Sequence, residues 1–277
     1  MEFCEVLSLV REKKPLVQCI TNFVTVNDCA NILLAAGASP TMAQDIREVE
    51  ESVECVGALV CNMGAIDFVD SMLLAGKRAN ELGIPVVLDP VAAGGTALRR
   101  EMSARLLNEL RFTAIRGNAS EIRALARQGG AGSGVDVSLK DEITEENLVE
   151  NVPMVEALAR ELGCVIAVSG KLDLISDGTR TALLRNGCAT MARITGSGCM
   201  LTTLVAAFCA AAPEKNFEAV CAAMAAMGIC GELAEEKRLI NKTGNASFRT
   251  DLIDAVFNLT EAQMKESIRY EIYKGTD

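Results

Sequence analysis

The feature that most constrains this chain is a regular alternation of short apolar runs with longer segments of helical periodicity. The strand-like runs cover residues 16–20, 58–62, 85–90, 112–115 and 164–168. Between and around them, helices are expected over 2–13, 25–36, 45–54, 65–82, from Asn118 onward, and over 153–162 with Pro153 in its first turn. Strands that alternate with helices of this length predict an α/β fold with a mainly parallel sheet covered by helices on both faces.

Three further segments complete the expected organisation. Residues 39–43 form a loop or a short edge strand, and 172–175 with 181–184 form a hairpin around Asp177-Gly178. Residues 128–137 are a Gly-rich insertion, and everything after residue 200 has helical character. No repeat, low-complexity tract or linker divides the chain, so residues 1–277 are predicted to form a single domain.

Composition excludes several classes of function. The formal charge of −10 argues against a nucleic-acid or anionic-membrane surface, which needs a basic footprint. The chain has eleven cysteines and no histidine. An odd count without C-x-x-C spacing favours reduced thiols in a cytoplasmic protein over disulfides or a zinc site, and a general base must be Asp, Glu, Cys, Lys or Tyr. No signal peptide is recognised, and apolar runs such as 201–213 are too short to span a membrane.

One loop carries the chemistry most directly: Ile194-Thr195-Gly196-Ser197-Gly198-Cys199-Met200-Leu201, which leads into an apolar helix. Its glycines allow close approach of a ligand, and the first helical turn offers unpaired N–H groups to an anion. We therefore expect an anion hole over 196–199, with the thiol pKa of Cys199 lowered by the helix N-terminus. A simple cap and tight turn is the alternative. Neither common phosphate motif applies, because Cys199 replaces the Lys of one and Leu201 a Gly of the other.

Polar residues also follow the predicted strands, where ligands bind in open α/β sheets. They are Thr21-Asn22, Asn62-Met63-Gly64, Asp89, Arg116-Gly117-Asn118 and Ser169-Gly170. Asp89 and Glu121 are two acids one βα unit apart that together suit Mg2+, and Arg116 suits a phosphate. The alternatives are a strand-end cap for Asp89, a solvated helix acid for Glu121 and a surface charge for Arg116.

Taken together, these motifs resemble the hydroxyethylthiazole kinases of the ribokinase-like superfamily over nearly the whole chain. The resemblance rests on Gln18-Cys19-Ile20-Thr21-Asn22-Phe23-Val24, Ala38-Ser39-Pro40-Thr41-Met42-Ala43, Leu88-Asp89-Pro90-Val91, Arg116-Gly117-Asn118-Ala119-Ser120-Glu121-Ile122 and the loop at 194–201. It implies a ribokinase-like three-layer domain that phosphorylates the primary alcohol of 4-methyl-5-(2-hydroxyethyl)thiazole, a step toward thiamine, with ATP as co-substrate and Mg2+ as cofactor.

The resemblance also assigns roles to individual residues. It implies that Asn22, Met42 and Gly196 bind the thiazole alcohol and that Cys199 is catalytic beside its hydroxyethyl arm. Arg116 and Ser169 are implied to bind ATP, and Asp89 and Glu121 to organise Mg2+. Such kinases are typically homotrimers with the thiazole pocket at the subunit boundary, so Met42 is expected to serve a neighbour's site.

Two positions depart from the family pattern. Cys188 stands where the family usually has His, in the pocket wall, and Lys171 stands where a Glu commonly lies near the nucleotide. Two rival functions remain open at this stage. One is a related ribokinase-like enzyme, either a kinase of a hydroxymethylpyrimidine or of pyridoxal or the ADP-dependent repair dehydratase. The other is a non-catalytic thiazole- or nucleotide-binding regulator.

Overall fold

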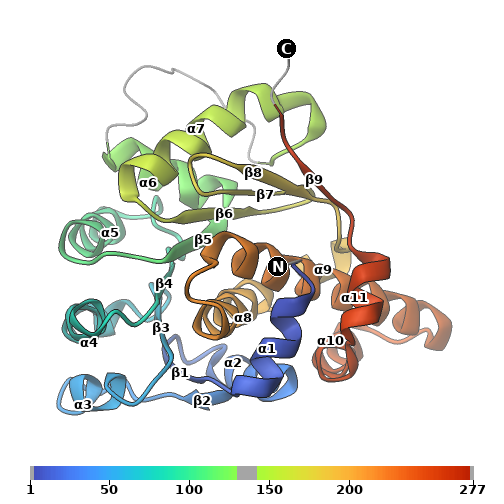
Figure 1. Cartoon of the computed structure of the whole chain (residues 1–277), viewed down its shortest axis with the longest axis horizontal. Coiled ribbons are helices and arrows are strands. Elements are labelled where there is room, and N and C mark those ends of the chain that lie inside the picture. Colours follow the sequence, from blue (N-terminus) through green and yellow to red (C-terminus); the bar gives the residue numbers. More distant parts are fainter. Residues whose placement is uncertain (1–2, 130–141, 275–277) are drawn as a thin grey trace.

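The computed structural model describes residues 3–129 and 142–274 (Figure 1). Within these ranges the strands form one nine-stranded sheet in the order β2-β1-β3-β4-β5-β6-β7-β8-β9. Their bounds are β1 Leu16–Ile20, β2 Ser39–Thr41, β3 Ala58–Asn62, β4 Val86–Asp89, β5 Ala114–Asn118, β6 Val165–Ser169, β7 Asp173–Ser176, β8 Thr181–Leu184 and β9 Tyr270–Ile272. Pairing is parallel from β2 to β6 and antiparallel from β6 to β9, which confirms the mainly parallel sheet, the edge strand and the hairpin.

Helices cover both faces of the sheet (Figure 1). Five lie on one face: α3 Val49–Val53, α4 Val69–Leu82, α5 Ala97–Glu109, α6 Ala119–Gly129 and α7 Leu148–Leu162. On the other face are α1 Glu5–Lys13, α2 Val26–Ala36, α8 Ser197–Ala211, α9 Asn216–Asn241, α10 Asn245–Asn258 and α11 Glu261–Ser267. The three-layer prediction is therefore confirmed.

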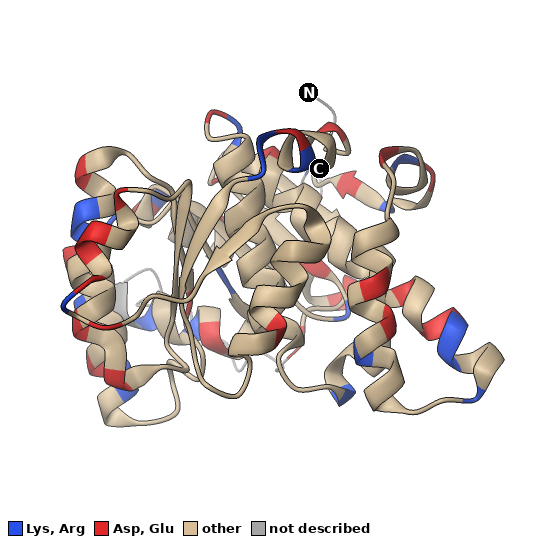
Figure 2. Cartoon of the chain, turned by 90° about the horizontal axis from the view of Figure 1, so that it is seen from below, with Lys and Arg blue, Asp and Glu red and all other residues tan. Residues whose placement is uncertain are grey.

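Side chains along the central strands point alternately to the two faces of the sheet, and apolar side chains on both faces explain why helices cover both. In β3, Ala58 and Val60 point into the core beneath α8, while Leu59 and Cys61 point into the core beneath α4. All four side chains are buried, as expected of a parallel strand between two helical layers. Charged residues gather on the outer helices, whereas the strands in the middle of the molecule carry few of them (Figure 2).

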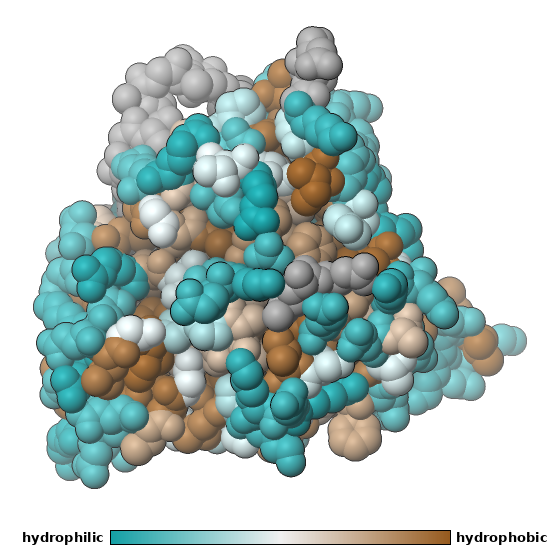
Figure 3. Space-filling model, in the orientation of Figure 1, coloured by the Kyte–Doolittle hydropathy of each residue, from teal (hydrophilic) through white to brown (hydrophobic). Residues whose placement is uncertain are grey.

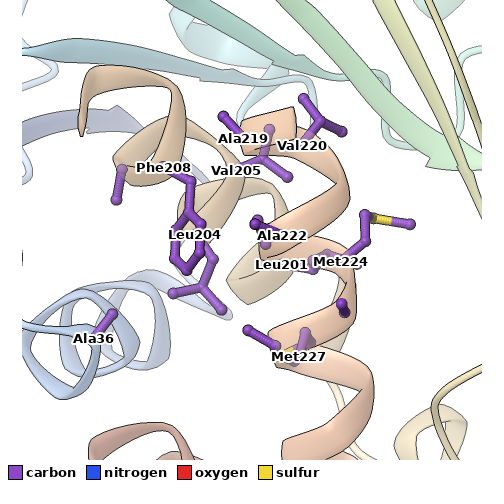
Figure 4. Close-up of a cluster of buried hydrophobic side chains, with 14 of the residues drawn as sticks. Ala36, Leu201, Leu204, Val205, Phe208, Ala219, Val220, Ala222, Met224 and Met227 are labelled. Carbon is purple, nitrogen blue, oxygen red and sulfur yellow. The ribbon is translucent and has the colours of Figure 1, made fainter. Parts of the chain in front are cut away.

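Helices α8 and α9 form the centre of one core. Leu201, Leu204 and Phe208 of α8 meet the Ala- and Met-rich face of α9 (Figure 4). α9 has 26 residues and a mean hydropathy of 1.5 over its most apolar window, enough by length and composition to cross a membrane. Because 83% of that window is buried inside the structure, α9 is a core helix. The surface is a mixture in which apolar side chains emerge between polar ones (Figure 3).

Four expectations about secondary structure were wrong or incomplete. The helix expected over 45–54 is confined to Val49–Val53. α7 begins at Leu148, after a capping box formed by Thr144 and Asn147, so Pro153 lies inside the helix rather than in its first turn. α5 was not predicted, because only Ser103 and Leu106 of it are buried and its apolar periodicity is weak.

The fourth correction concerns the C-terminus, which was expected to be entirely helical. Instead, Tyr270–Ile272 adds β9 to the sheet by antiparallel pairing with β8. Tyr270 and Ile272 flank Glu271 in an apolar–polar–apolar order, but three exposed residues are too short a run to predict a strand, so the pairing is decided by the free edge of β8. Most of the Gly-rich insertion at 128–137 lies outside the described residues.

Candidate active site

The polar residues predicted to follow the strands do meet at one edge of the sheet. β1, β3, β4, β5 and β6 are consecutive neighbours, and their carboxyl ends point the same way because the strands are parallel. The register pairs Asn62 with Asp89 and Asn118 with Ser169. Asn22, which follows β1 by two residues, reaches Asn62 through its side-chain amide at 3.3 Å.

The N-terminus of α8 faces this edge of the sheet. Gly196 is its N-cap in the left-handed region, with φ of 86°, and no side chain caps the helix. The first intrahelical bond runs from the N–H of Met200 to the carbonyl of Gly196, at 2.9 Å. The N–H groups of Ser197, Gly198 and Cys199 therefore precede the helical ladder, a geometry that suits the anion hole predicted over 196–199.

Arg116 lies directly against this helix end. Its side chain is buried, and one nitrogen donates to Oγ of Ser169. A Cβ added to Gly198 would lie only 2.6 Å from Nη1 of Arg116. The Nε atom of Arg116 is buried without a hydrogen-bond partner. A buried guanidinium with an unused donor, placed beside open backbone N–H groups, is suited to binding a phosphate.

A cavity of about 600 Å3 opens in front of Arg116. Ser169, Ser197 and Gly198 line it, together with the two residues that depart from the family pattern, Lys171 and Cys188. The apolar part of the wall consists of Leu201, Met224 and Met227. The cavity therefore combines an end that carries Arg116 and open N–H groups with an apolar end, a pairing that suits a nucleotide.

Asn22, Met42, Gly196 and Cys199 do not line that cavity. Cys199 instead faces the ends of β1 and β3, where its Sγ accepts from Nδ2 of Asn62 at 3.2 Å and from Nδ2 of Asn22 at 3.5 Å. The first turn of α8 thus separates two environments. Ser197 and Gly198 face the cavity, and Cys199 faces an amide network.

The expectation of a lowered thiol pKa at Cys199 was wrong. Burial raises the pKa of Cys199 above its ordinary value, and the nearby charge of Asp89 raises it further. Hydrogen bonds from Thr25, Asn62 and Asn22 oppose this effect only in part. The helix N-terminus is present as predicted, but desolvation outweighs it, so the uncharged thiol is favoured at neutral pH.

Asp89 and Glu121 are close enough for the charge of Glu121 to raise the pKa of Asp89. Burial is the largest cause, and it brings the pKa of Asp89 to about 6 against the opposing charge of Arg116. Oδ2 of Asp89 accepts from Asn62 at 3.0 Å and from Thr202 at 2.9 Å. Glu121 accepts from the backbone N–H groups of Ala92 at 2.9 Å and Asn118 at 2.8 Å.

This acidic pair fits Mg2+ in its donor chemistry. Among the described residues no group of three or more His, Cys, Asp or Glu side chains could hold a metal ion. Mg2+ does not need such a group, since it is commonly held by one or two carboxylates together with water and substrate phosphates. The raised pKa of Asp89 also indicates a buried carboxylate that lacks a full complement of positive charge.

Met42 lies apart from the cavity, half-buried just after β2 at the edge of the sheet. Its loop is tied to β1 by a bond from Nε2 of Gln18 to the carbonyl of Ala43, at 3.0 Å. Large apolar side chains near Asn22 and Met42 are exposed: Phe23 is 90% exposed, Val24 55% and Ile46 52%. These three side chains neighbour Asn22 and Met42 in the sequence and leave apolar surface open to contact with a partner.

Sequence reasoning missed three residues of this region. Asn62 was noted as a strand-end residue but received no role, although it bonds to Asn22, Cys199 and Asp89. Thr202, one turn along α8, fixes Asp89, and its only signal was its position three residues after Cys199. Asp173 lines the cavity and accepts from the N–H of Gly170 at 2.9 Å. Nothing in its local sequence indicates that a side chain at the start of a hairpin strand is buried there.

Comparison with known proteins agrees with this geometry. The model of a family described as the hydroxyethylthiazole kinase family matches residues 7–262. A hydroxyethylthiazole kinase of Clostridium acetobutylicum is 46% identical over 271 residues, covering 97% of this chain and 99% of that protein. A hydroxyethylthiazole kinase structure from Pyrococcus horikoshii superposes with a TM-score of 0.85 at 35% identity, covering 98% and 99% of the two chains.

A more distant structure shows the fold alone. The pyridoxal kinase of Staphylococcus aureus in complex with pyridoxal is 13% identical and superposes with a TM-score of 0.59, covering 93% of this chain and 97% of that one. The ribokinase-like architecture is thus shared at low identity, as expected for a fold that serves several substrates.

Proposed function

Because the chain belongs to the hydroxyethylthiazole kinase family, it is a small-molecule kinase of thiamine salvage, and we propose a role for each of its site residues in that reaction. The reaction transfers the γ-phosphoryl group of ATP to the primary alcohol of 4-methyl-5-(2-hydroxyethyl)thiazole. One observation carries the assignment of the ATP site. The buried Arg116, with its unpaired Nε, lies against Gly198 where the open turn of α8 meets the cavity.

ATP occupies the cavity in this proposal. Arg116 and Ser169 bind the phosphates, and the N–H groups of Ser197, Gly198 and Cys199 receive the γ-phosphoryl oxygens as charge spreads over them. The apolar wall of Leu201, Met224 and Met227 accommodates the base. Lys171 lines the cavity and adds a positive charge to it beside that of Arg116.

The thiazole alcohol lies on the other side of the α8 N-terminus. Asn22, Met42 and Gly196 bind it, and Asn62 holds Asn22 and Cys199 in place. Cys199 is the catalytic residue beside the hydroxyl. Since its thiol pKa is raised, Cys199 mainly orients the hydroxyl, whose proton leaves late in a loose phosphoryl-transfer transition state.

Asp89 and Glu121 hold Mg2+ directly or through water. When bound, the ion would supply positive charge that offsets the charge of the phosphates. Hydrogen bonds hold the carboxylates of Asp89 and Glu121 in fixed positions. Thr202 and Asn62 immobilise Asp89, and two backbone N–H groups immobilise Glu121, so neither carboxylate has to be ordered when the nucleotide binds.

We further propose that the chain is a single domain that assembles as a homotrimer with sites at the subunit boundaries. The exposed Phe23, Val24 and Ile46 beside Asn22 and Met42 support this, because a second subunit would cover them and complete the thiazole pocket. A cytoplasmic location is supported by the state of the cysteines, all eleven of which are free.

A coupled ADP-release assay tests the function. We expect ADP formation that requires both the thiazole alcohol and Mg2+, and a lower kcat/KM with pyridoxal or a hydroxymethylpyrimidine as acceptor. ADP release with another acceptor at equal or greater efficiency would assign a different substrate. Light scattering in the same buffer tests the trimer, and a monomer with full activity would contradict a shared site.

A further inference from the structure

One wall of the nucleotide cavity is a short backbone segment, residues 185–187, that follows β8. Asn186 and Gly187 line the cavity. Gly187 has φ of 130°, a conformation that other residues rarely adopt. Gly228 of α9 packs so tightly against this wall that an added Cβ would lie 2.8 Å from the backbone of Asn186. The shape of the cavity therefore depends on how this segment is held.

Glu232, one turn further along α9, holds the segment from one side. Its carboxylate accepts from the N–H of Gly187 at 2.7 Å and from Nδ2 of Asn186 at 3.3 Å. A carboxylate that accepts two such bonds fixes both the backbone and the side chain of the wall.

Arg269, just before β9, holds the segment from the other side. Its guanidinium pairs with both oxygens of Glu232 and donates to the carbonyl of Arg185 at 2.7 Å. Its N–H donates to Oδ1 of Asn186 at 2.8 Å, and its carbonyl accepts from the N–H of Arg185 at 3.0 Å. Nδ2 of Asn186 also donates to the carbonyl of Ser267 at 3.0 Å.

The C-terminal segment thus contacts all three residues of the cavity wall. Arg269 bonds directly to Arg185 and Asn186, and it holds Gly187 through Glu232. β9 runs beside β8, the strand that leads into residues 185–187 (Figure 1). The segment lies beyond residue 262, where the match to the family model ends.

We propose that Arg269, supported by β9, is a positioning residue for nucleotide binding. The proposal rests on the assignment of ATP to the cavity. Arg269 touches the wall and not the nucleotide, and it acts by keeping Glu232, Asn186 and Gly187 in one arrangement. Without it, the left-handed Gly187 and its neighbours sample other conformations in the free enzyme, and binding must order them. The thiazole side lies across the first turn of α8, and within residues 3–129 and 142–274 no hydrogen bond joins Asn22 or Cys199 to this network.

The test compares Arg269→Ala, Arg269→Lys and Glu232→Gln with the control Arg105→Ala. Arg105 is a comparably exposed arginine whose ion pairs with Asp70 and Glu109 lie on α4 and α5. Steady-state kinetics give kcat and the KM values for ATP and the thiazole alcohol, and calorimetry gives the Kd for ADP. For Arg269→Ala we expect KM for ATP and Kd for ADP to rise roughly tenfold, with KM for the thiazole alcohol unchanged.

The KM for ATP and Kd for ADP of Arg269→Lys should lie between those of wild type and Arg269→Ala. An ammonium can pair with Glu232 but lacks the second donor group with which the planar guanidinium also reaches the carbonyl of Arg185. Glu232→Gln should also raise the Kd for ADP. The proposal would be overturned if KM for ATP and Kd for ADP of Arg269→Ala equalled those of Arg105→Ala. It would also be overturned if KM for ATP and KM for the thiazole alcohol rose equally. If Arg269→Ala does not fold, Arg269→Lys and Glu232→Gln decide by the same criteria. Wild-type protein that binds no ADP would instead refute the assignment of the cavity.

Discussion

The guanidinium of Arg116 occupies the space that a side chain at Gly198 would need, since a Cβ there would lie 2.6 Å from Nη1. Close packing between a buried cation and the backbone of a helix N-terminus brings the charge and the N–H groups to one point. Glycine at position 198 is thus required by the packing of Arg116 rather than by the helix.

Gly198→Ala is expected to displace Arg116 and raise KM for ATP by about tenfold, with a smaller effect on the thiazole alcohol. Steady-state kinetics with each substrate varied in turn provide the measurement. Gly244→Ala is a matched control, because a Cβ at Gly244 meets nothing within 4 Å. An unchanged KM for ATP in Gly198→Ala would show that Arg116 does not act on the nucleotide.

Substitutions at Cys199 separate orientation from base catalysis. Burial raises its thiol pKa, so we expect Cys199→Ala to lower kcat by about tenfold, less than removal of a strong general base would. Cys199→Asp should retain activity, because a carboxylate can still accept a bond from the substrate hydroxyl. The measurement is kcat at saturating ATP and Mg2+. Turnover in the Ala variant equal to that of wild type would exclude a catalytic role for Cys199.

Gly196 should be less tolerant than Cys199. Its φ of 86° favours glycine, and an added Cβ would lie 2.8 Å from Cγ2 of Thr25. A bulky residue such as Val would therefore move the first turn of α8 and disturb all three open N–H groups together. We expect kcat of Gly196→Val to fall by about a hundredfold or more, beyond the loss in Cys199→Ala. Near-normal kcat in a folded variant would count against the anion hole.

The strand-end residues of the site were predictable because parallel strands bring their carboxyl ends to one edge. Asp89, Arg116 and Ser169 each follow or end an apolar run, and the sheet order then places them side by side. The role of the glycines at 196 and 198 could also be predicted, since a small-residue loop before an apolar helix predicts an open helix N-terminus.

What the sequence did not reveal depends on contacts between distant segments. Asn62 and Cys199 are 137 residues apart, and no local pattern shows that the amide of one faces the thiol of the other. The direction of the pKa shift of Cys199 likewise depends on burial by surrounding elements, which competes with the helix N-terminus and prevails. β9 is only three residues long and exposed, too short a run to be predicted as a strand, and it forms where β8 offers an edge.

Asp173 supplies a prediction about pH. Burial raises its pKa from 3.8 to about 7, despite the N–H of Gly170 and the charge of Arg116, which both lower it. In this range the folded protein binds a proton at Asp173 that the unfolded chain has released. Stability contributed by this group is therefore fully present below the unfolded pKa and is lost as pH rises through about 7.

Asp173→Asn removes this titration while its Oδ1 can still accept from Gly170. Relative to wild type, the free energy of unfolding of the variant should increase by about 2 to 3 kcal/mol between about pH 5 and about pH 8. Urea unfolding of both nucleotide-free proteins across this range gives the difference directly, and pH effects common to both proteins cancel. A difference that is constant with pH would mean that Asp173 keeps an ordinary pKa and is ionised in the folded cavity. The carboxylate would then repel nucleotide phosphates even at about pH 5, where a group with a pKa of about 7 is protonated, and Asp173→Asn would lower the Kd for ADP at that pH as well.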